Sequence, residues 1–226
     1  MASLITETPS PITGEKILAA LSYGSVNRKT GNVDTLWILH ADTPPHEAVT
    51  NGQDASICGN CPHRRKHGTT KDCYVLPHQA ALSVWNSLKN PQPYRPMSRV
   101  LRLGGYGDPA MIPEKTIEAL MGDYDATLGY TQQWEEPWAQ VANLYCMASV
   151  LSIKGKKKAN KKGWRTFRTS YKKGITDLQP DEVICPAVTH PGITCEACRL
   201  CQGNNRHSKN IVVEAHGTNS KALIKL

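Results

Sequence analysis

Residues 101–113 read LRLGGYGDPAMIP, and this stretch says most about the fold. Its apolar start predicts a short strand over 100–103, and the glycines that follow allow a sharp turn and a close approach to a ligand. A proline then suits the first turn of a helix over 113–121, whose apolar residues share one face. A strand, a glycine loop and a helix in this order are typical of one unit of a parallel α/β sheet.

Short strands and helical stretches alternate along the rest of the chain. Strands are predicted at 35–39, 126–130, 164–169, 183–184 and 211–215, and helical segments at 15–21, 79–88 and 137–142. A complete eight-stranded barrel usually needs about 250 residues. The 226 residues here therefore favour an α/β fold built as a partial (β/α) barrel of about six strands. We expect residues 1–34 to form an N-terminal arm, loose over 1–14, and residues 35–226 to form the barrel domain.

The composition predicts a globular protein that keeps its cysteines reduced. Hydrophobic residues make up 39% of the sequence and charged residues 20%, which allows a buried core and excludes wholesale disorder. We find no secretory signal and no apolar stretch of membrane-spanning length, so we expect a cytoplasmic protein without a membrane partner. In that compartment the eight cysteines are better explained as metal ligands or core thiols than as disulfides.

The first cysteine cluster has the spacing Cys58-x2-Cys61-x11-Cys73. Three thiolates leave one coordination position open, which is the arrangement of a reactive iron–sulfur or metal site. Alternatively, a nearby histidine supplies a fourth ligand and closes a structural zinc site. The histidines that could do so are His63, His67 and His78.

A second cluster lies late in the chain and supplies four thiolates, enough for a closed site. Its x2 spacings resemble those of ferredoxins, so a four-iron cluster is favoured and tetrahedral zinc is the alternative. The members of this cluster are Cys185, Cys195, Cys198 and Cys201. The eighth cysteine, Cys146, stands alone in an apolar run and is predicted to be a buried core thiol.

These motifs together resemble a known family. The early cysteines end in Cys73-Tyr74, and residues 102–109 follow as R-x-Gly-Gly-x-Gly-Asp-Pro. Residues 129–134 then read GYTQQW, and a late Cys-Pro precedes the second cysteine cluster. The combination resembles the phage gene product 88 family and, more loosely, the radical S-adenosylmethionine (SAM) enzymes. The resemblance spans residues 58–217 and implies a phage protein located in the host cytoplasm.

The resemblance also implies a partial barrel and two [4Fe–4S] clusters. The open iron of the cluster on the three early cysteines would bind the amino and carboxylate groups of SAM. The four late cysteines would hold an auxiliary cluster that the protein ligates completely. This chain departs from the common radical SAM spacing, Cys-x3-Cys-x2-Cys, because its own spacing is Cys-x2-Cys-x11-Cys.

In radical SAM enzymes a Gly-Gly-Glu-Pro loop holds the amino group of SAM. The counterparts in this chain, and hence the candidate cofactor-binding residues, are Gly104, Gly105, Gly107 and Asp108. The loop differs from the family pattern by an inserted Tyr-Gly and by an aspartate in place of glutamate. It matches neither the dinucleotide-binding fingerprint nor a P-loop.

The net charge of +8 arises from one segment. Residues 154–173 hold ten lysines and arginines and no acid, whereas the rest of the chain carries 17 basic and 19 acidic residues. The segment is also interleaved with Trp164, Phe167 and Tyr171, so it could follow phosphates and stack a base, or form a solvated loop. The candidate nucleic-acid-binding residues are Lys156, Lys157, Lys158, Lys161, Lys162, Arg165 and Arg168.

Two hypotheses for the function follow. The first is an iron–sulfur protein related to radical SAM enzymes that acts on a nucleic acid or a nucleotide. The second is a non-enzymatic nucleic-acid-binding phage protein whose zinc or iron–sulfur sites only stabilise the fold. Hydrolase motifs are absent from the sequence. Further residues that could line a site, although a surface role is expected for each, are Arg102, His190, His207 and His216.

Overall fold

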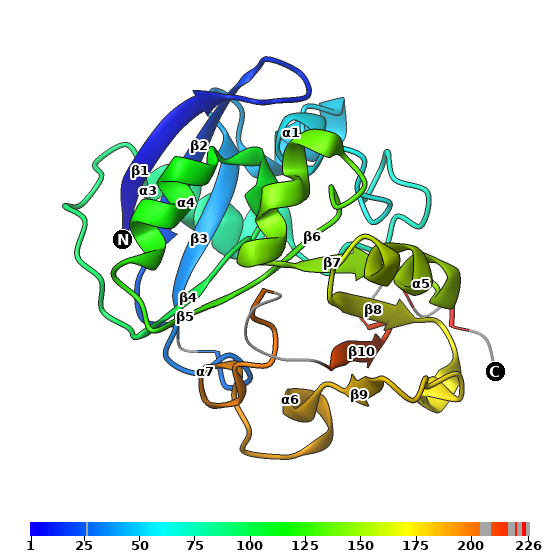
Figure 1. Cartoon of the computed structure of the whole chain (residues 1–226). Coiled ribbons are helices and arrows are strands. Elements are labelled where there is room, and N and C mark those ends of the chain that lie inside the picture. Colours follow the sequence, from blue (N-terminus) through cyan, green and yellow to red (C-terminus); the bar gives the residue numbers. More distant parts are fainter. Residues whose placement is uncertain (26, 204–208, 217–219, 221–222, 225–226) are drawn as a thin grey trace.

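The computed structural model describes residues 1–25, 27–203, 209–216, 220 and 223–224, and the strands in this part form two five-stranded sheets (Figure 1). The first has the order β1 (Ala2–Pro9), β2 (Lys16–Ser22), β3 (Asp34–His40), β4 (Val100–Arg102) and β5 (Ala126–Leu128). The second has the order β6 (Tyr130–Thr131), β7 (Met147–Val150), β8 (Thr166–Ser170), β10 (Asn210–Glu214) and β9 (Glu182–Ile184).

Strand directions confirm a mixed α/β fold with parallel strands. β1, β2 and β3 pair antiparallel, and β3, β4 and β5 pair parallel. All neighbours in the second sheet are parallel. Within the described residues, no strand pairing closes the sheets into a barrel.

The two sheets meet at Gly129, the one residue between β5 and β6. The chain pairs with the first sheet on one side, where Leu103 donates to Leu128, and with the second on the other, where Met147 donates to Gly129. A Cβ at position 129 would lie 2.9 Å from the Cβ of Leu103 and 3.2 Å from the sulfur of Cys146. Glycine is therefore needed where the chain passes from one sheet to the other.

Helices and short turns connect the strands. In the described residues they are α1 (Pro45–Asn51), α2 (Ala55–Cys58), α3 (Leu82–Ser87), α4 (Glu114–Met121), α5 (Ile153–Lys161), α6 (Pro186–Thr189) and α7 (Cys195–Cys198), with the 3-10 or π turns η1 (Pro77–Ala81), η2 (Pro109–Met111), η3 (Pro137–Leu144) and η4 (Lys173–Ile175). The helix predicted after the glycine loop is α4. Helix α5 packs on β7 and β8 (Figure 1).

The first 34 residues are not an arm. They form β1 and β2, and β2 lies between β1 and β3 in the first sheet. The helix expected over 15–21 is also wrong, because residues 16–22 form β2. Five successive residues of this strand are buried. A strand covered on both faces reads as a continuous apolar run, which periodicity cannot distinguish from a buried helix.

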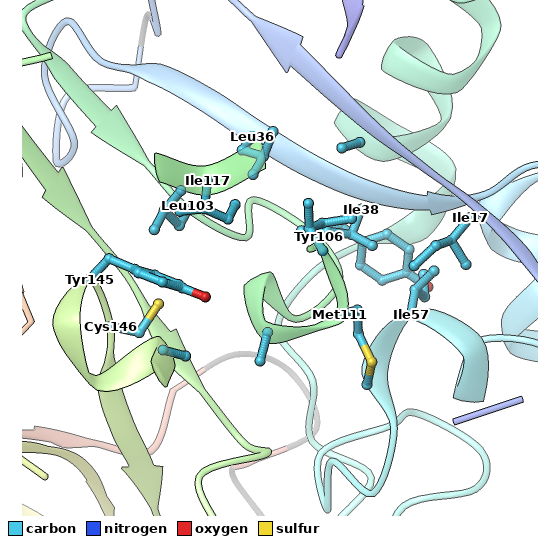
Figure 2. Close-up of a cluster of buried hydrophobic side chains, with 14 of the residues drawn as sticks. Ile17, Leu36, Ile38, Ile57, Leu103, Tyr106, Met111, Ile117, Tyr145 and Cys146 are labelled. Atoms are coloured by element: carbon cyan, nitrogen blue, oxygen red, sulfur yellow. The ribbon is translucent and has the colours of Figure 1, made fainter. Parts of the chain in front are cut away.

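The main core gathers side chains from both sheets and from the segments between them. Figure 2 shows Ile17, Leu36 and Ile38 of the first sheet facing Ile57, Met111 and Ile117, with Leu103, Tyr106, Tyr145 and Cys146 in the same cluster. Cys146 is fully buried, and burial raises the pKa of its thiol, so the prediction of a core thiol is confirmed. This core holds the glycine loop and the first cysteine segment against the same strands.

Candidate metal centres

The three early cysteines lie on the wall of one cavity. Cys58 ends α2, and Cys61 and Cys73 lie in the loop that follows, around a cavity of about 440 Å³. Burial raises the pKa of all three thiols, and the charges of Cys61 and Cys73 raise that of Cys58 further. The three thiols therefore lie on one cavity wall and influence one another electrostatically.

The long spacing between Cys61 and Cys73 is taken up by a loop that folds back on itself. The amide of Thr70 donates to the carbonyl of Pro62 at 2.9 Å, and the amide of Cys73 donates to the carbonyl of His63, also at 2.9 Å. These bonds return the chain to the cavity after eleven intervening residues. The unusual spacing thus still places Cys73 on the wall of the cavity that Cys58 and Cys61 line.

Backbone amides face several of the cysteine sulfurs. The amides of His63 and Arg64 act on Cys61, that of Val75 acts on Cys73, and that of Ala187 acts on Cys185; each lowers the pKa of its thiol against the larger, raising effect of burial. Hydrogen bonds to sulfur stabilise the thiolate, which is the form that ligates metals. These backbone amides therefore favour the thiolate form of the cysteines they face.

Three buried polar atoms near the early cysteines have no hydrogen-bond partner in the described part of the chain: two donors, Nε of Arg64 and the hydroxyl of Tyr106, and one acceptor, Oε1 of Gln133. Tyr106 is 5% exposed and lines the 440 Å³ cavity, with its ring among Ile17, Ile38 and Ile57 (Figure 2). Burial, followed by the charge of Cys58, raises the pKa of Tyr106, so its hydroxyl stays a donor.

These two donors bear on the kind of group that fits. A zinc ion offers them no acceptor, whereas the sulfides of an iron–sulfur cluster accept hydrogen bonds. Arg64 is held beside Cys58 and Cys61 by its bond from Nη2 to Asp54, and the charges of both thiols act on it. Of the two donors, Tyr106 is the one that lines the cavity, so its hydroxyl is the group that could donate to a cluster sulfide there.

The glycine loop contributes to the same cavity through two of its three glycines. Gly104 and Gly107 line it, with φ of +71° and +77°. Gly105 was expected to contact a cofactor, but a Cβ there would meet Thr35 and Trp37 instead, 2.5 and 3.1 Å away. The amide of Gly105 donates to the carbonyl of Leu36 at 2.8 Å and so holds the loop against β3. At this close approach there is no room for a side chain.

Asp108 also lines the cavity, but its carboxylate already accepts three hydrogen bonds. The donors are the amide of Ala110 at 3.0 Å, the hydroxyl of Thr131 at 2.6 Å and the amide of Gln132 at 2.7 Å. Burial raises the pKa of Asp108 in spite of these bonds. The side chain joins η2 to β6, so it stabilises the loop as well as facing the cavity.

The four late cysteines line a second, smaller cavity of about 120 Å³. Burial raises the pKa of Cys201, and the charges of the other three thiols raise it further. The amide of Cys195 donates to the carbonyl of Lys29 at 2.9 Å, and the amide of Gly129 donates to that of Cys201 at 3.1 Å. Cys185 and Cys195 line the larger cavity as well, so the two cavities adjoin.

Neither set forms a closed metal-binding arrangement. Among the described residues, no three cysteine, histidine, aspartate or glutamate side chains have the geometry of a metal site. The cysteines line common cavities without converging on one point. The clusters therefore belong to the proposal below.

His63 is the one of the three candidate histidine ligands that lines the large cavity. Its Nδ1 lies 2.6 Å from Oδ1 of Asp72, a residue that the sequence analysis missed although it directly precedes Cys73. His78 is exposed, and His67 lies beside Gly52, whose Cβ would sit 3.5 Å from its Nε2. A histidine held by a carboxylate is typical of zinc ligands. If the early cysteines bind zinc, His63 is therefore the candidate for the fourth ligand.

The basic segment does not form one surface. Lys156, Arg165 and Arg168 are buried, which corrects their assignment to nucleic-acid binding. Lys156 pairs with Asp181, Arg165 donates to backbone carbonyls, and Arg168 pairs with two carboxylates. The residues that remain exposed, on α5 and directly after it, are Lys157, Lys158, Lys161 and Lys162.

The three aromatic side chains of the segment serve the interior. Trp164 is buried and donates to Gln140 at 3.1 Å, and Phe167 lines both cavities. The hydroxyl of Tyr171 donates to Asp72 at 2.8 Å and so connects the end of β8 to the first cysteine loop. None of the three forms an exposed platform on which a base could stack.

Of the further candidates, Arg102 and His216 line the large cavity, whereas His190 is exposed and His207 lies outside the described residues. Comparison of the chain with protein-family models, curated proteins and solved structures gave no match. The described residues include no helix with the length and apolar character needed to span a membrane.

Proposed function

We propose that this chain is an iron–sulfur protein related to radical SAM enzymes, with its parallel strands arranged as a partial barrel. Ligands of parallel sheets bind at the carboxyl ends of the strands. Arg102 ends β4, Thr169 lies near the end of β8, Val213 near the end of β10, and all three line the large cavity. The early cysteines lie at the same cavity, which supports its role as the active site.

In this proposal Cys58, Cys61 and Cys73 would hold a [4Fe–4S] cluster with one open iron, and Gly104 and Gly107 would flank SAM. Such a cluster supplies the electron for the reductive cleavage of SAM. The four late cysteines would hold a second, fully ligated cluster. The observation that carries the proposal is the unpartnered hydroxyl of Tyr106 on the wall of the cavity that the three early cysteines line.

Variants at single cysteines test this assignment. Protein purified without oxygen from C73S should lose the iron of the first site, C201S should lose that of the second, and each loss should be about half of the total. C146A is the matched control, because Cys146 is buried away from both cavities and should keep all the iron. Addition of SAM should change the EPR spectrum of the wild-type protein and of C201S, but not that of C73S. Equal iron in all variants would contradict the assignment.

A second candidate is a nucleic-acid-binding protein stabilised by zinc, and exposed lysines favour it. Lys154, Lys157 and Lys161 lie exposed on α5, and no carboxylate of the described residues pairs with them. Binding of DNA or RNA that falls steeply with salt, and weakens in the K157A/K161A double variant, would support a nucleic-acid partner. The same result in an iron-loaded protein would identify the substrate class of the first proposal.

A further inference from the structure

An arginine without a carboxylate partner lies between the two cysteine cavities. Arg102 lines both of them. The described residues include every aspartate and glutamate of the chain, and none forms an ion pair with Arg102. Its Nη2 donates to the hydroxyl of Tyr74 at 3.1 Å, and that hydroxyl lies 3.2 Å from the hydroxyl of Tyr130. The hydrogen-bond partner that the described residues give Arg102 is thus a neutral phenol, with the thiol of Cys195 on the same cavity wall.

Other arginines inside the protein use their donors on the protein itself: Arg165 donates to backbone carbonyls, and two more have carboxylate partners. Arg64 pairs with Asp54, and Arg168 pairs with Asp177 and Glu182. Removing a charge from bulk water without a counter-charge is costly, so proteins pair such groups or reserve them for a ligand. The planar guanidinium suits carboxylate and phosphate groups, which it binds through two parallel hydrogen bonds.

Flat rings lie next to this guanidinium. Tyr130 and Phe167 stack with their ring centroids 4.5 Å apart and their planes at 17°, and both line the two cavities. The ring of Tyr74, whose hydroxyl accepts from Arg102, lies 5.5 Å from that of His216. A ligand here would find a cation beside aromatic surfaces, within a cavity of about 440 Å³.

We propose that Arg102 binds the oxyanion, a carboxylate or a phosphate, of a small substrate whose planar part packs against Tyr130 and Phe167. The inference rests on the proposed function only in treating this cavity as the substrate site. It names a class of substrate, planar small anions, that includes single nucleotides and excludes nucleic-acid polymers.

Isothermal titration of the purified full chain tests the proposal. The probes are adenosine monophosphate and benzoate, each compared with its uncharged counterpart, adenosine and benzamide. We expect at least one anion to bind at least tenfold more tightly than its counterpart, and the anion that binds separates phosphate from carboxylate. In R102Q the affinity for the anion should fall at least tenfold. R102K keeps the charge but cannot donate two parallel hydrogen bonds, so its affinity should be intermediate.

The control is R99Q, because the Arg99 side chain is 80% exposed, pairs with Asp125 and lies outside both cavities. It should bind the anion like the wild type. R102Q should melt no lower than the wild type without ligand, since it removes an unpaired charge. Equal affinity in R102Q and wild type, or no binding of either anion by the wild type at millimolar concentration, would overturn the proposal.

Arg102 could instead act as the counter-charge of the late cysteines, because the charge of Cys195 acts on it. Metal content distinguishes this role from substrate binding. Loss of metal from R102Q with unchanged anion affinity would assign Arg102 to the late cysteines and overturn the substrate role. Protein without iron that still binds the anion through Arg102 would contradict the proposed function alone. The two failures are therefore distinguishable.

Discussion

His63 Nδ1 lies 2.6 Å from Oδ1 of Asp72, a carboxylate that also accepts hydrogen bonds from Thr70 and Tyr171. Burial opposes ionisation, but these bonds together lower the pKa of Asp72 below its usual range. The network joins the first cysteine loop to the end of β8. The loop therefore owes its position to a polar network as well as to any metal it holds.

This relationship separates the two candidate cofactors at the early cysteines. If a cluster with an open iron is bound, His63 is not a ligand and H63A should keep the iron of the wild type. If zinc is bound by three thiolates and one imidazole, H63A should bind zinc at least tenfold more weakly. H78A is the matched control, because His78 is exposed and outside the cavity. Metal analysis of the three proteins decides between the alternatives.

Arg168 should matter for stability rather than for binding. Its Nε donates to Glu182 at 2.6 Å and its Nη1 donates to Asp177 at 2.9 Å, with Arg168 and Glu182 both buried. R168L leaves the carboxylate of Glu182 buried without its partner, so the free energy of unfolding should fall by about 3–5 kcal/mol. K157A should change it by less than about 0.5 kcal/mol, because that lysine is exposed. Urea unfolding measures both, and a small loss in R168L would contradict the buried ion pair.

The ion pair of Asp177 should make the stability of the protein fall in acid. Burial alone would raise its pKa, but the bonds from Ser170 and Arg168 lower it below the ordinary value. A lowered pKa stabilises the fold above the ordinary carboxylate value of about 4, and this contribution disappears as the pH falls through the lowered value. Wild-type protein should therefore lose more free energy of unfolding between pH 5 and pH 3 than D177N does. Parallel pH curves for the two proteins would be evidence against the ion pair.

Gly107 is required by space as well as by backbone conformation. It has a φ of +77°, and a Cβ there would lie 2.6 Å from both the Cβ and the carbonyl oxygen of Ile38. G107A should lower the free energy of unfolding by more than about 2 kcal/mol. Gly163 has a similar φ of +83°, but a Cβ there would meet none of the described atoms within 4 Å, so G163A isolates the backbone strain, about 1–2 kcal/mol. Equal losses would mean that β3 does not constrain the loop.

The local pattern of the sequence predicted much of the fold. The strand, glycine loop and helix around residues 100–121 are present as β4, η2 and α4. The pattern failed at β2, where burial on both faces removes the alternation that identifies a strand. The N-terminal residues were misjudged because their partner, β3, comes later in the chain.

The cysteine spacing identified the residues around the cavities but not their surroundings. The two sets adjoin because β4 and β6 bring Arg102 and Tyr130 between them, which depends on strand order. The charge run was misleading at Arg168, whose acidic partners Asp177 and Glu182 lie outside the run. Composition alone cannot separate a buried pair from an exposed cation.

Iron and acid-labile sulfide, measured in protein purified without oxygen, test the central claim most directly. The proposed function predicts brown protein with about eight irons and eight sulfides per chain, and an EPR signal that SAM alters once the protein is reduced. Colourless protein that contains zinc and no sulfide would contradict it.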